Sequence, residues 1–193
     1  FDSPLGMDDG EFRISLAGAQ EKMALLYWKD QWWEPQGQTP TSHIMKKKMG
    51  KILGNIDFSS SVDNEWICLR LAAALGIRTC EATIEKFVDE RVLCVKRFDR
   101  VWKDKALHRI PQEDFCQALG VSPQQKYERD GGPGFRAAMK LLETSNNADQ
   151  DRKTLLKLAL FNDLIHNTDG HIKNISIYVL RSGFALTPMY DLM

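Results

Sequence analysis

The sequence predicts an α+β fold of two lobes, a β-rich N-terminal lobe over residues 1–98 and a helical C-terminal lobe over residues 99–193. Short runs of β-forming residues alternate with turn residues in the first half. In the second half, apolar residues recur at helical spacing through several segments. The chain has 193 residues, which is enough for one substantial core or for two lobes of roughly 100 residues each.

In the first half, each element is defined by turn residues or by its apolar spacing. Residues 62–75 are expected to form a helix, because Val62, Trp66 and Leu69 recur at helical spacing and a glycine follows. Two prolines and a glycine in residues 34–40 mark a loop. The other expected elements are strands at residues 23–28, 32–33 and 42–46, and a hairpin formed by residues 82–87 and 91–98.

From Pro111 onward the pattern becomes helical. Pro111 suits the first turn of a helix that carries Phe115 and ends at Gly120. Two further helices are expected at residues 135–142 and 151–167. They are followed by a strand at residues 174–180, a turn at 181–183 and a second strand at 184–187.

The charge balance limits the classes of function. Lys and Arg total 26 and Asp and Glu total 26, so no net charge is available to steer the chain onto nucleic acid or anionic lipid. No run approaches the ~20 apolar residues that span a bilayer, and the start of the chain lacks the features of a signal peptide. We therefore expect a cytoplasmic protein that contacts no membrane and does not bind DNA on its own.

The cysteines and the chain ends carry two further expectations. The cysteines are far apart and form no C-x-x-C motif, so we expect reduced core thiols at Cys68, Cys80, Cys94 and Cys116. The chain starts at Phe1 rather than at a methionine and stops at Met193 without a helix or cap. We therefore expect a fragment of a larger protein.

The most informative segment contains Asp169, then Asn174, then Asp191 after one hairpin. Phosphoryl transfer needs a carboxylate that accepts the proton of the attacking hydroxyl, and oxygen ligands that hold Mg²⁺ against the phosphates. The ordered trio could supply both. A single Asp in a loop is usually a turn or cap residue, but this order after a long helix is uncommon by chance.

A small-residue loop near the N-terminus is a candidate for binding phosphate. Small side chains let backbone N–H groups approach a polyphosphate closely. The loop matches neither G-x-x-x-x-G-K-[ST] nor G-x-G-x-x-G, so a tight turn before a strand is the alternative interpretation. The candidate residues are Ala17, Gly18, Ala19, Gln20, Glu21 and Lys22.

Two further segments could complete a nucleotide site. Lys46 ends a predicted strand and is followed by a helix that carries Glu65, which is the order of the phosphate-binding Lys and its orienting Glu in kinases. The alternative is an exposed lysine at a strand end. Lys96 and Phe98 lie where the strand is expected to give way to helix and could offer backbone groups to adenine. The alternative there is an amphipathic strand end.

Two other classes of enzyme are disfavoured. His166 and His171 are five residues apart, which is off the i, i+4 register of a helical zinc pair. No serine lies in a G-x-S-x-G setting. The sequence therefore gives little support to a zinc hydrolase or a serine hydrolase.

Several motifs together resemble HipA-type serine/threonine kinases, the toxin components of bacterial toxin–antitoxin pairs. The resemblance covers nearly the whole chain in order. It is carried by residues 12–22 (FRISLAGAQEK), 61–65 (SVDNE), 96–100 (KRFDR), 110–114 (IPQED), 126–127 with 130–134, 168–171 (TDGH) with Lys173 and Asn174, and 186–191 (LTPMYD).

The resemblance implies a two-lobed protein-kinase-like fold that uses ATP and Mg²⁺. Asp169 matches the catalytic base, and Asn174 and Asp191 match the Mg²⁺ ligands. Ser15 matches an autophosphorylation site, whose phosphate would add roughly −1.5 to −2 charge to the loop that must hold ATP and would expel that loop. The implied ATP contacts are residues 17–22, Lys46, Lys96, Phe98, His171, Asn174, Tyr190 and Asp191.

The resemblance also implies partners. Family toxins phosphorylate translation factors such as aminoacyl-tRNA synthetases, and their antitoxin is a helix-turn-helix repressor of the HipB type. DNA would then be reached only through the antitoxin. Lys96 departs from the family, where Glu is common, but hinge contacts use the backbone. A small-molecule phosphotransferase and an inactive nucleotide-binding scaffold acting with a repressor are the alternatives.

Overall fold

The computed structural model describes residues 20–52, 56–122, 128, 132–167 and 169–193. The chain forms two compact units. The first combines residues up to Ile67 with Glu81–His108, and the second combines Cys68–Cys80 with Arg109–Met193. Helix α1 (Ser61–Ala74) contributes its start to the first unit and its end to the second. The boundary between an N-terminal lobe and a C-terminal lobe that was expected after residue 98 stays a prediction.

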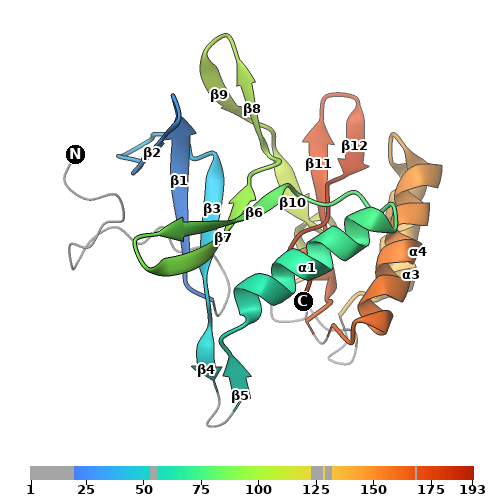
Figure 1. The fold of residues 1–193 in the computed structure, drawn as a ribbon. Helices are drawn as coiled ribbons and strands as arrows, with labels where there is room; N and C mark the ends of the chain where they lie inside the picture. The colour runs from blue at the N-terminus through green and yellow to red at the C-terminus, as the bar shows by residue number, and fades with distance from the viewer. Residues whose placement is uncertain (1–19, 53–55, 123–127, 129–131, 168) are drawn as a thin grey trace. The chain divides into compact units, whose positions relative to one another are not determined.

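The first unit is built on an antiparallel five-stranded sheet (Figure 1). Its strand order is β2-β1-β3-β7-β6, so β3 lies at the centre. The strands are β1 (Lys22–Trp28), β2 (Gln31–Trp33), β3 (His43–Lys47), β6 (Ala82–Phe87) and β7 (Glu90–Lys96). The strands, the helix and the 82–98 hairpin predicted for this half are confirmed, with ends shifted by a few residues.

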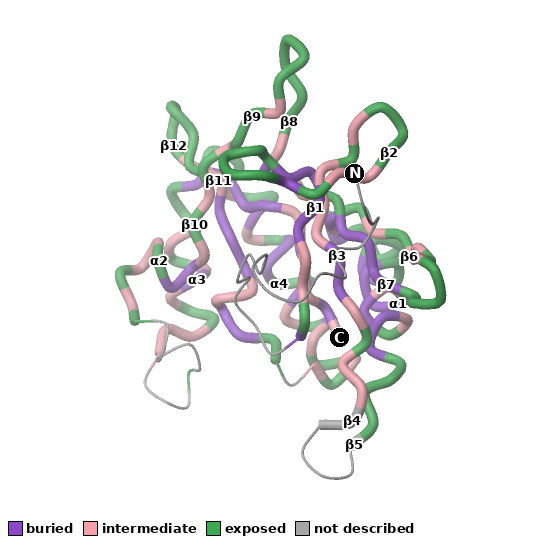
Figure 2. Tube along the Cα trace, turned by 90° about the vertical axis from the view of Figure 1, so that its left-hand side faces the viewer, coloured by how far each residue is buried: buried purple, intermediate pink, exposed green. Residues whose placement is uncertain are grey.

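The two faces of this sheet differ because successive side chains of a strand point to opposite sides. On one face Met45 lies opposite Met23 and Cys94, and these pack with other apolar residues into a core. Lys46 is therefore on the other face, opposite Lys22 of β1. Figure 2 shows how much of β3 and β7 is buried. The sheet thus places two lysines on the face that is not filled by this core.

Two short hairpins of the first unit escaped prediction. They pair β4 (Gly50–Ile52) with β5 (Ile56–Phe58), and β8 (Arg100–Lys103) with β9 (Ala106–Arg109). The expectation that strand gives way to helix after residue 98 is therefore wrong. Asp104 and Lys105 both have positive φ, 50° and 65°, which matches the right-handed twist of a tight hairpin.

The second unit contains helices and an antiparallel three-stranded sheet of order β10-β11-β12. Its core includes Phe115, Leu142 and Leu158. The helices are α2 (Phe115–Ala118), α3 (Phe135–Leu141) and α4 (Ala148–Leu164), with short 3-10 segments η3 (Leu142–Thr144) and η4 (Ile172–Asn174). The strands are β10 (Gln112–Asp114), β11 (Ser176–Leu180) and β12 (Gly183–Leu186).

The helix expected to open at Pro111 is a second correction. Residues 112–114 instead form β10, which pairs with β11. The helix begins at Phe115, where Asp114 and Gln117 form a capping box: each side chain accepts a 2.9 Å hydrogen bond from the other residue's backbone N–H. Helix α4 begins and ends about one turn earlier than expected, with Asp149 and Asp151 in its first turn.

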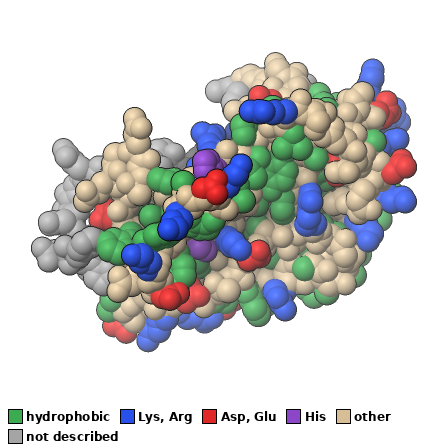
Figure 3. Space-filling view, turned by 90° about the horizontal axis from the view of Figure 1, so that it is seen from above, with side chains coloured by type: hydrophobic (Ala, Val, Ile, Leu, Met, Phe, Trp, Pro, Cys, Tyr) green, Lys and Arg blue, Asp and Glu red, His purple; other side chains and the backbone are tan. Residues whose placement is uncertain are grey.

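The surface and the thiols agree with the composition. Cationic and anionic side chains are interspersed on the face drawn in Figure 3. The four cysteines are free and buried, as predicted. Burial raises the pKa of the Cys94 thiol to about 12, with a smaller contribution from the Glu85 carboxylate. Among the described residues, no helix has the length and apolar character needed to cross a bilayer.

Candidate active site

The first unit contains a buried ion pair between a strand and a helix. Lys46 Nζ of β3 lies 2.5 Å from Glu65 Oε1 of α1. The two side chains are only 7% and 1% exposed. The alternative of an exposed strand-end lysine is therefore wrong, and the predicted contact between Lys46 and Glu65 is confirmed. A paired lysine on this face can offer positive charge to an anion.

The segment that enters β1 is tied to β3 by its side chains. Gln20 is buried, and its Nε2 donates a 2.6 Å hydrogen bond to the Lys47 carbonyl. The Lys47 backbone N–H donates to the Glu21 carbonyl at 3.2 Å, and Lys47 Nζ lies 3.3 Å from Glu21 Oε1. Gln20 thus anchors the end of the predicted phosphate loop. Ser15, Ala17, Gly18 and Ala19 lie outside the described residues.

The predicted adenine-binding segment follows β7. The Lys96 side chain makes an exposed ion pair with Glu81, with 2.9 Å between Nζ and Oε2. The backbone N–H groups of Lys96 and Arg97 donate to the carbonyls of Glu81 and Ser42, both at 2.9 Å. Phe98 follows, half-buried, before the β8–β9 hairpin. Lys96 is therefore placed as a strand residue whose side chain points to solvent.

In the second unit, a loop after α4 carries Asp169 and His171. The Asp169 carboxylate is 55% exposed, and its Oδ1 lies 3.3 Å from His171 Nε2. The loop is shaped by backbone bonds: the Asp169 N–H donates to Asn167 Oδ1 at 3.0 Å, and the His171 N–H donates to the Asp169 carbonyl at 2.8 Å. The carboxylate is thus presented to solvent while its backbone is held.

Asn174 is close to the same loop, as the sequence predicted. Its Nδ2 donates a 3.0 Å hydrogen bond to the Asp169 carbonyl, and its N–H donates to the His171 carbonyl at 3.0 Å. The amide oxygen takes no part in that side-chain bond. A carboxylate and an amide oxygen are ligands that Mg²⁺ accepts, so the donor types of Asn174 and Asp191 fit that ion.

The segment before Asp191 is clamped from two sides. Residues 78–80 pair with it: the Met189 N–H donates to the Arg78 carbonyl and the Cys80 N–H donates to the Met189 carbonyl, both at 2.8 Å. On the other side, Tyr190 Oη lies 2.6 Å from Ser176 Oγ. Asp191 itself has φ 59°, a left-handed conformation that is uncommon for a non-glycine residue. These contacts therefore fix the backbone position from which the Asp191 side chain extends.

A pocket of about 310 Å³ lies beside the loop, within the second unit. Its walls come from α3, α4 and the residues that follow Asp169. They are mainly apolar and include Leu155, Leu158, Asn162, Gly170, His171 and Ile175. His171, a predicted nucleotide contact, is buried and lines this pocket, so its ring packs in the interior of the second unit beneath the Asp169 loop.

The likeness to known proteins agrees with this arrangement. Residues 14–193 match the family of HipA-like C-terminal domains. The chain belongs to the HipA-like family. It is 38% identical over 192 residues to a putative kinase, Y4mE, of Sinorhizobium fredii, and 34% identical over 203 residues to the serine/threonine-protein kinase toxin HipA of Shewanella oneidensis.

This HipA-like chain spans a little under half the length of those relatives. Each match covers 98% of the chain but 44% and 45% of the respective relative. Among solved structures, HipA of Shewanella oneidensis, in a complex with HipB and operator DNA, superposes with a TM-score of 0.77 and 34% identity. That match covers 99% of this chain and 46% of the other.

A more distant solved structure supports the fold alone. The proinflammatory kinase CtkA of Helicobacter pylori superposes with a TM-score of 0.55 at 12% identity, covering 87% of this chain and 53% of its own. The two-lobed kinase-like fold class predicted from the sequence is therefore confirmed.

The structure of the HipA-like chain also adds residues that sequence analysis did not assign. Lys173 Nζ lies 2.8 Å from Asp114 Oδ2, which ties the Asp169 loop to the capping box of α2. Buried Asp151 accepts the Leu186 N–H at 2.9 Å through Oδ2, which also accepts from Ser145 Oγ. The Lys173–Asp114 and Asp151–Leu186 contacts join residues that are 59 and 35 positions apart in sequence, so no local pattern could reveal them.

Proposed function

We propose that this chain is the catalytic part of an ATP- and Mg²⁺-dependent protein serine/threonine kinase. The observation that carries the proposal is the buried 2.5 Å pair between Lys46 and Glu65. A lysine on a strand, held by a helix glutamate, is the arrangement with which protein kinases hold the ATP phosphates. The order of Asp169, Asn174 and Asp191 supports the same chemistry.

Each residue then has a distinct role. Asp169 accepts the proton of the attacking hydroxyl, a role that its exposed carboxylate allows. Asn174 and Asp191 would hold Mg²⁺, which neutralises charge on the phosphates when bound. Lys46 and Lys22 attract the phosphates from one face of the sheet. His171 and Tyr190 support the Asp169 and Asp191 segments and contact the nucleotide.

The predicted loop of residues 17–22 covers the phosphates in this proposal. Gln20 and Glu21 anchor its end to β3, which carries Lys46. Phosphorylation of Ser15 adds charge that would repel the ATP phosphates. Lys96 and Phe98 contribute backbone groups to the adenine, so the side chain at position 96 can vary.

The partners are proposed from the relatives. The Shewanella oneidensis HipA structure contains HipB and operator DNA. We assign to this chain a helix-turn-helix antitoxin of the HipB type, through which alone it reaches DNA. The proposed substrate is a protein of the translation apparatus, as the resemblance to HipA-type toxins implies; the relative's name, a serine/threonine-protein kinase toxin, supports only that the substrate is a protein.

Transfer from γ-labelled ATP tests the proposed function in the intact protein. Asp169→Asn should reduce phosphate incorporation roughly 10²–10⁴-fold, because the general base is lost. Asp163→Asn, an exposed residue at the end of α4, is the matched control and should leave incorporation unchanged. Peptide mapping should locate phosphate on Ser15 in the wild-type protein.

Each other outcome identifies an alternative. Unchanged incorporation in Asp169→Asn would remove the base assignment. ATP binding without transfer to any acceptor would indicate an inactive nucleotide-binding scaffold. Transfer only to added small molecules, with neither Ser15 nor another protein hydroxyl labelled, would indicate a small-molecule phosphotransferase.

A further inference from the structure

A buried charge cluster lies beside the predicted adenine-binding segment and has no role in the assignments above. Asp99 is 2% exposed, and two arginines, Arg97 and Arg100, surround its carboxylate. The arginine side chains are 16% and 11% exposed. Burying charges is costly unless they are paired and hydrogen-bonded, so a cluster at this place calls for a function.

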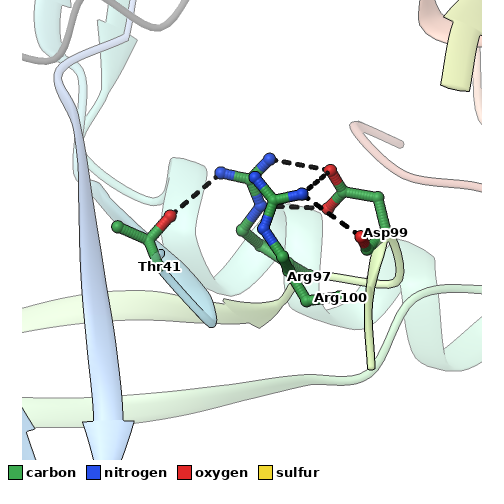
Figure 4. Close-up of polar contacts among 4 residues, drawn as sticks. All are labelled: Thr41, Arg97, Asp99 and Arg100. Carbon is green, nitrogen blue, oxygen red and sulfur yellow. Dashed lines mark hydrogen bonds and ion pairs between the residues drawn. The ribbon is translucent and has the colours of Figure 1, made fainter. Parts of the chain in front are cut away.

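Asp99 accepts hydrogen bonds from both arginines (Figure 4). Arg97 makes a two-point contact, with Nε donating to Oδ1 at 3.0 Å and Nη2 donating to Oδ2 at 2.8 Å. Arg100 Nη1 donates to the same Oδ2 at 2.7 Å and to the Asp99 carbonyl at 3.2 Å. Bidentate guanidinium contacts of this kind fix geometry as well as charge.

The cluster also reaches the segment that leads into β3, the strand that carries Lys46. Arg97 Nη1 donates to Thr41 Oγ1 at 3.0 Å, and the Arg97 N–H donates to the Ser42 carbonyl at 2.9 Å. Both acceptors lie just before β3 (His43–Lys47). Side chain and backbone of one arginine therefore hold the end of β7 against the entry to β3.

These bonds restrict the backbone on both sides of Phe98. Before it, the Arg97 N–H is fixed to Ser42, and after it, the Arg100 N–H closes a turn onto the Arg97 carbonyl at 3.3 Å. Asp99 is held by its side chain and by its carbonyl. The directions of the peptide groups around Phe98 are thus set by the cluster.

Peptide direction decides which purine a backbone segment accepts. Adenine presents an amino donor beside a ring-nitrogen acceptor, whereas guanine presents a carbonyl acceptor beside an N–H donor. A backbone that is fixed in register matches one pattern and leaves polar groups of the other without bonds, which gives strong discrimination. A backbone that can shift by about one peptide loses that discrimination.

Resting on the proposed kinase function, we propose that Asp99 is a positioning residue for base recognition. With Arg97, Arg100 and Thr41, it fixes the backbone at Phe98 in the register that accepts adenine and rejects guanine. Asp99 need not touch the nucleotide. Its effect is on the selectivity between ATP and GTP, which carry the same triphosphate.

Competition binding tests this with the intact protein, Mg²⁺ and a fluorescent ATP analogue displaced by ATP or by GTP. Asp99→Asn keeps the shape of the side chain but loses its charge, and should lower the ATP preference, Kd(GTP)/Kd(ATP), roughly tenfold, as expected for one lost hydrogen bond to the base. Thr41→Val leaves the ion pairs in place and should lower the ratio about two- to threefold. Asp63→Asn, which removes an exposed pair with Arg91 of β7, is the matched control and should leave the ratio unchanged.

The outcomes separate the two proposals. If wild type binds neither nucleotide, the proposed kinase function fails. If wild type prefers ATP but both variants keep its ratio, or weaken ATP and GTP equally, the cluster is only structural and the positioning role is wrong. If Asp99→Asn does not fold, Thr41→Val decides: an unchanged ratio overturns the proposal.

Discussion

The two units of the chain differ in how their candidate functional charges are held. In the first unit, Lys46 and Glu65 are almost fully buried and bind each other. In the second unit, the Asp169 carboxylate is half exposed, and the loop is held by backbone and amide bonds to Asn167 and Asn174. The Lys46–Glu65 pair is thus part of the folded core, whereas the Asp169 carboxylate is presented to solvent on a loop held by hydrogen bonds.

This difference predicts different consequences of mutation. A buried ion pair is strongly coupled to folding, because removal of one partner leaves a charge in the interior. An exposed carboxylate contributes little to stability, so its loss affects chemistry alone. Stability and activity should therefore change together for the Lys46–Glu65 pair of the first unit and separately for Asp169 of the second unit.

Glu65→Ala should have the largest effect on stability. We expect the free energy of unfolding to fall by roughly 3–5 kcal/mol, because the Lys46 ammonium loses its buried carboxylate. Asp63→Ala is the matched control on the same helix, since its pair with Arg91 is exposed, and should cost about 0–1 kcal/mol. Urea denaturation measures both values.

A double variant separates the two roles of this pair. Lys46→Met with Glu65→Leu replaces the pair with apolar side chains and should recover most of the lost stability, as such replacements often do. ATP affinity should nevertheless be lost in the double variant, because the positive charge of Lys46 is gone. Equal costs for Glu65→Ala and Asp63→Ala would show that the buried pair is no more coupled to folding than an exposed one.

Gly170→Ala should have a smaller effect on stability and a larger one on turnover. A Cβ at this position would lie 2.8 Å from Asn162 Nδ2, and the Asn162 side chain is held by a 3.2 Å bond from Asn167 Nδ2. Either the loop or the Asn162 side chain, which would then lose its bond from Asn167, must shift, and this should cost about 1–2 kcal/mol of stability. A displaced Asp169 should lower kcat roughly 10- to 100-fold.

The same substitution elsewhere controls for backbone effects. At Gly37, which has φ +56°, a Cβ meets nothing within 4 Å. Gly37→Ala should cost about 1 kcal/mol through its left-handed conformation and leave kcat unchanged. If Gly170→Ala and Gly37→Ala have the same kcat, close packing at Gly170 does not position the Asp169 loop.

The parts of the fold that could be predicted are those whose signal is local. Strands β1, β3, β6 and β7 follow from short β-forming runs between turn residues. The β8–β9 hairpin was not predicted because its two strands have only four residues each and are mostly exposed, so no alternation of apolar residues marks them. The helix expected at Pro111 was wrong because proline is tolerated both at the first turn of a helix and beside an edge strand. The pairing of β10 with β11, which the local sequence does not reveal, makes residues 112–114 a strand.

The candidate site shows the same limit. Lys46 and Glu65 could be paired from residue type and order alone, because kinase chemistry requires that combination. The Asp99 cluster could not, since Thr41 and Arg97 are 56 residues apart and meet only through the pairing of β3 with β7. Sequence therefore predicts the groups that do chemistry better than the contacts that position them.

The smallest predicted effect concerns pH and the buried half of the site. His43 begins β3 and packs edge-on against Trp32, with ring centroids 5.0 Å apart and planes at 83°. Burial lowers its pKa below the ordinary 6.5, and the nearby Lys96 ammonium lowers it further. Below pH 6.5 the unfolded chain binds a proton at this position more readily than the folded protein does.

Folded stability should therefore be complete above pH 6.5 and should decline as the pH falls through 6.5 toward the lowered pKa of His43. Urea denaturation at about pH 7.5 and about pH 5.5 measures this decline, which His43→Gln should reduce. His108→Gln, an exposed histidine of β9, should keep the wild-type decline. An equal decline in wild type and His43→Gln would mean that protonation of the His43 imidazole does not oppose folding, and that packing around β3 does not change the pKa of His43.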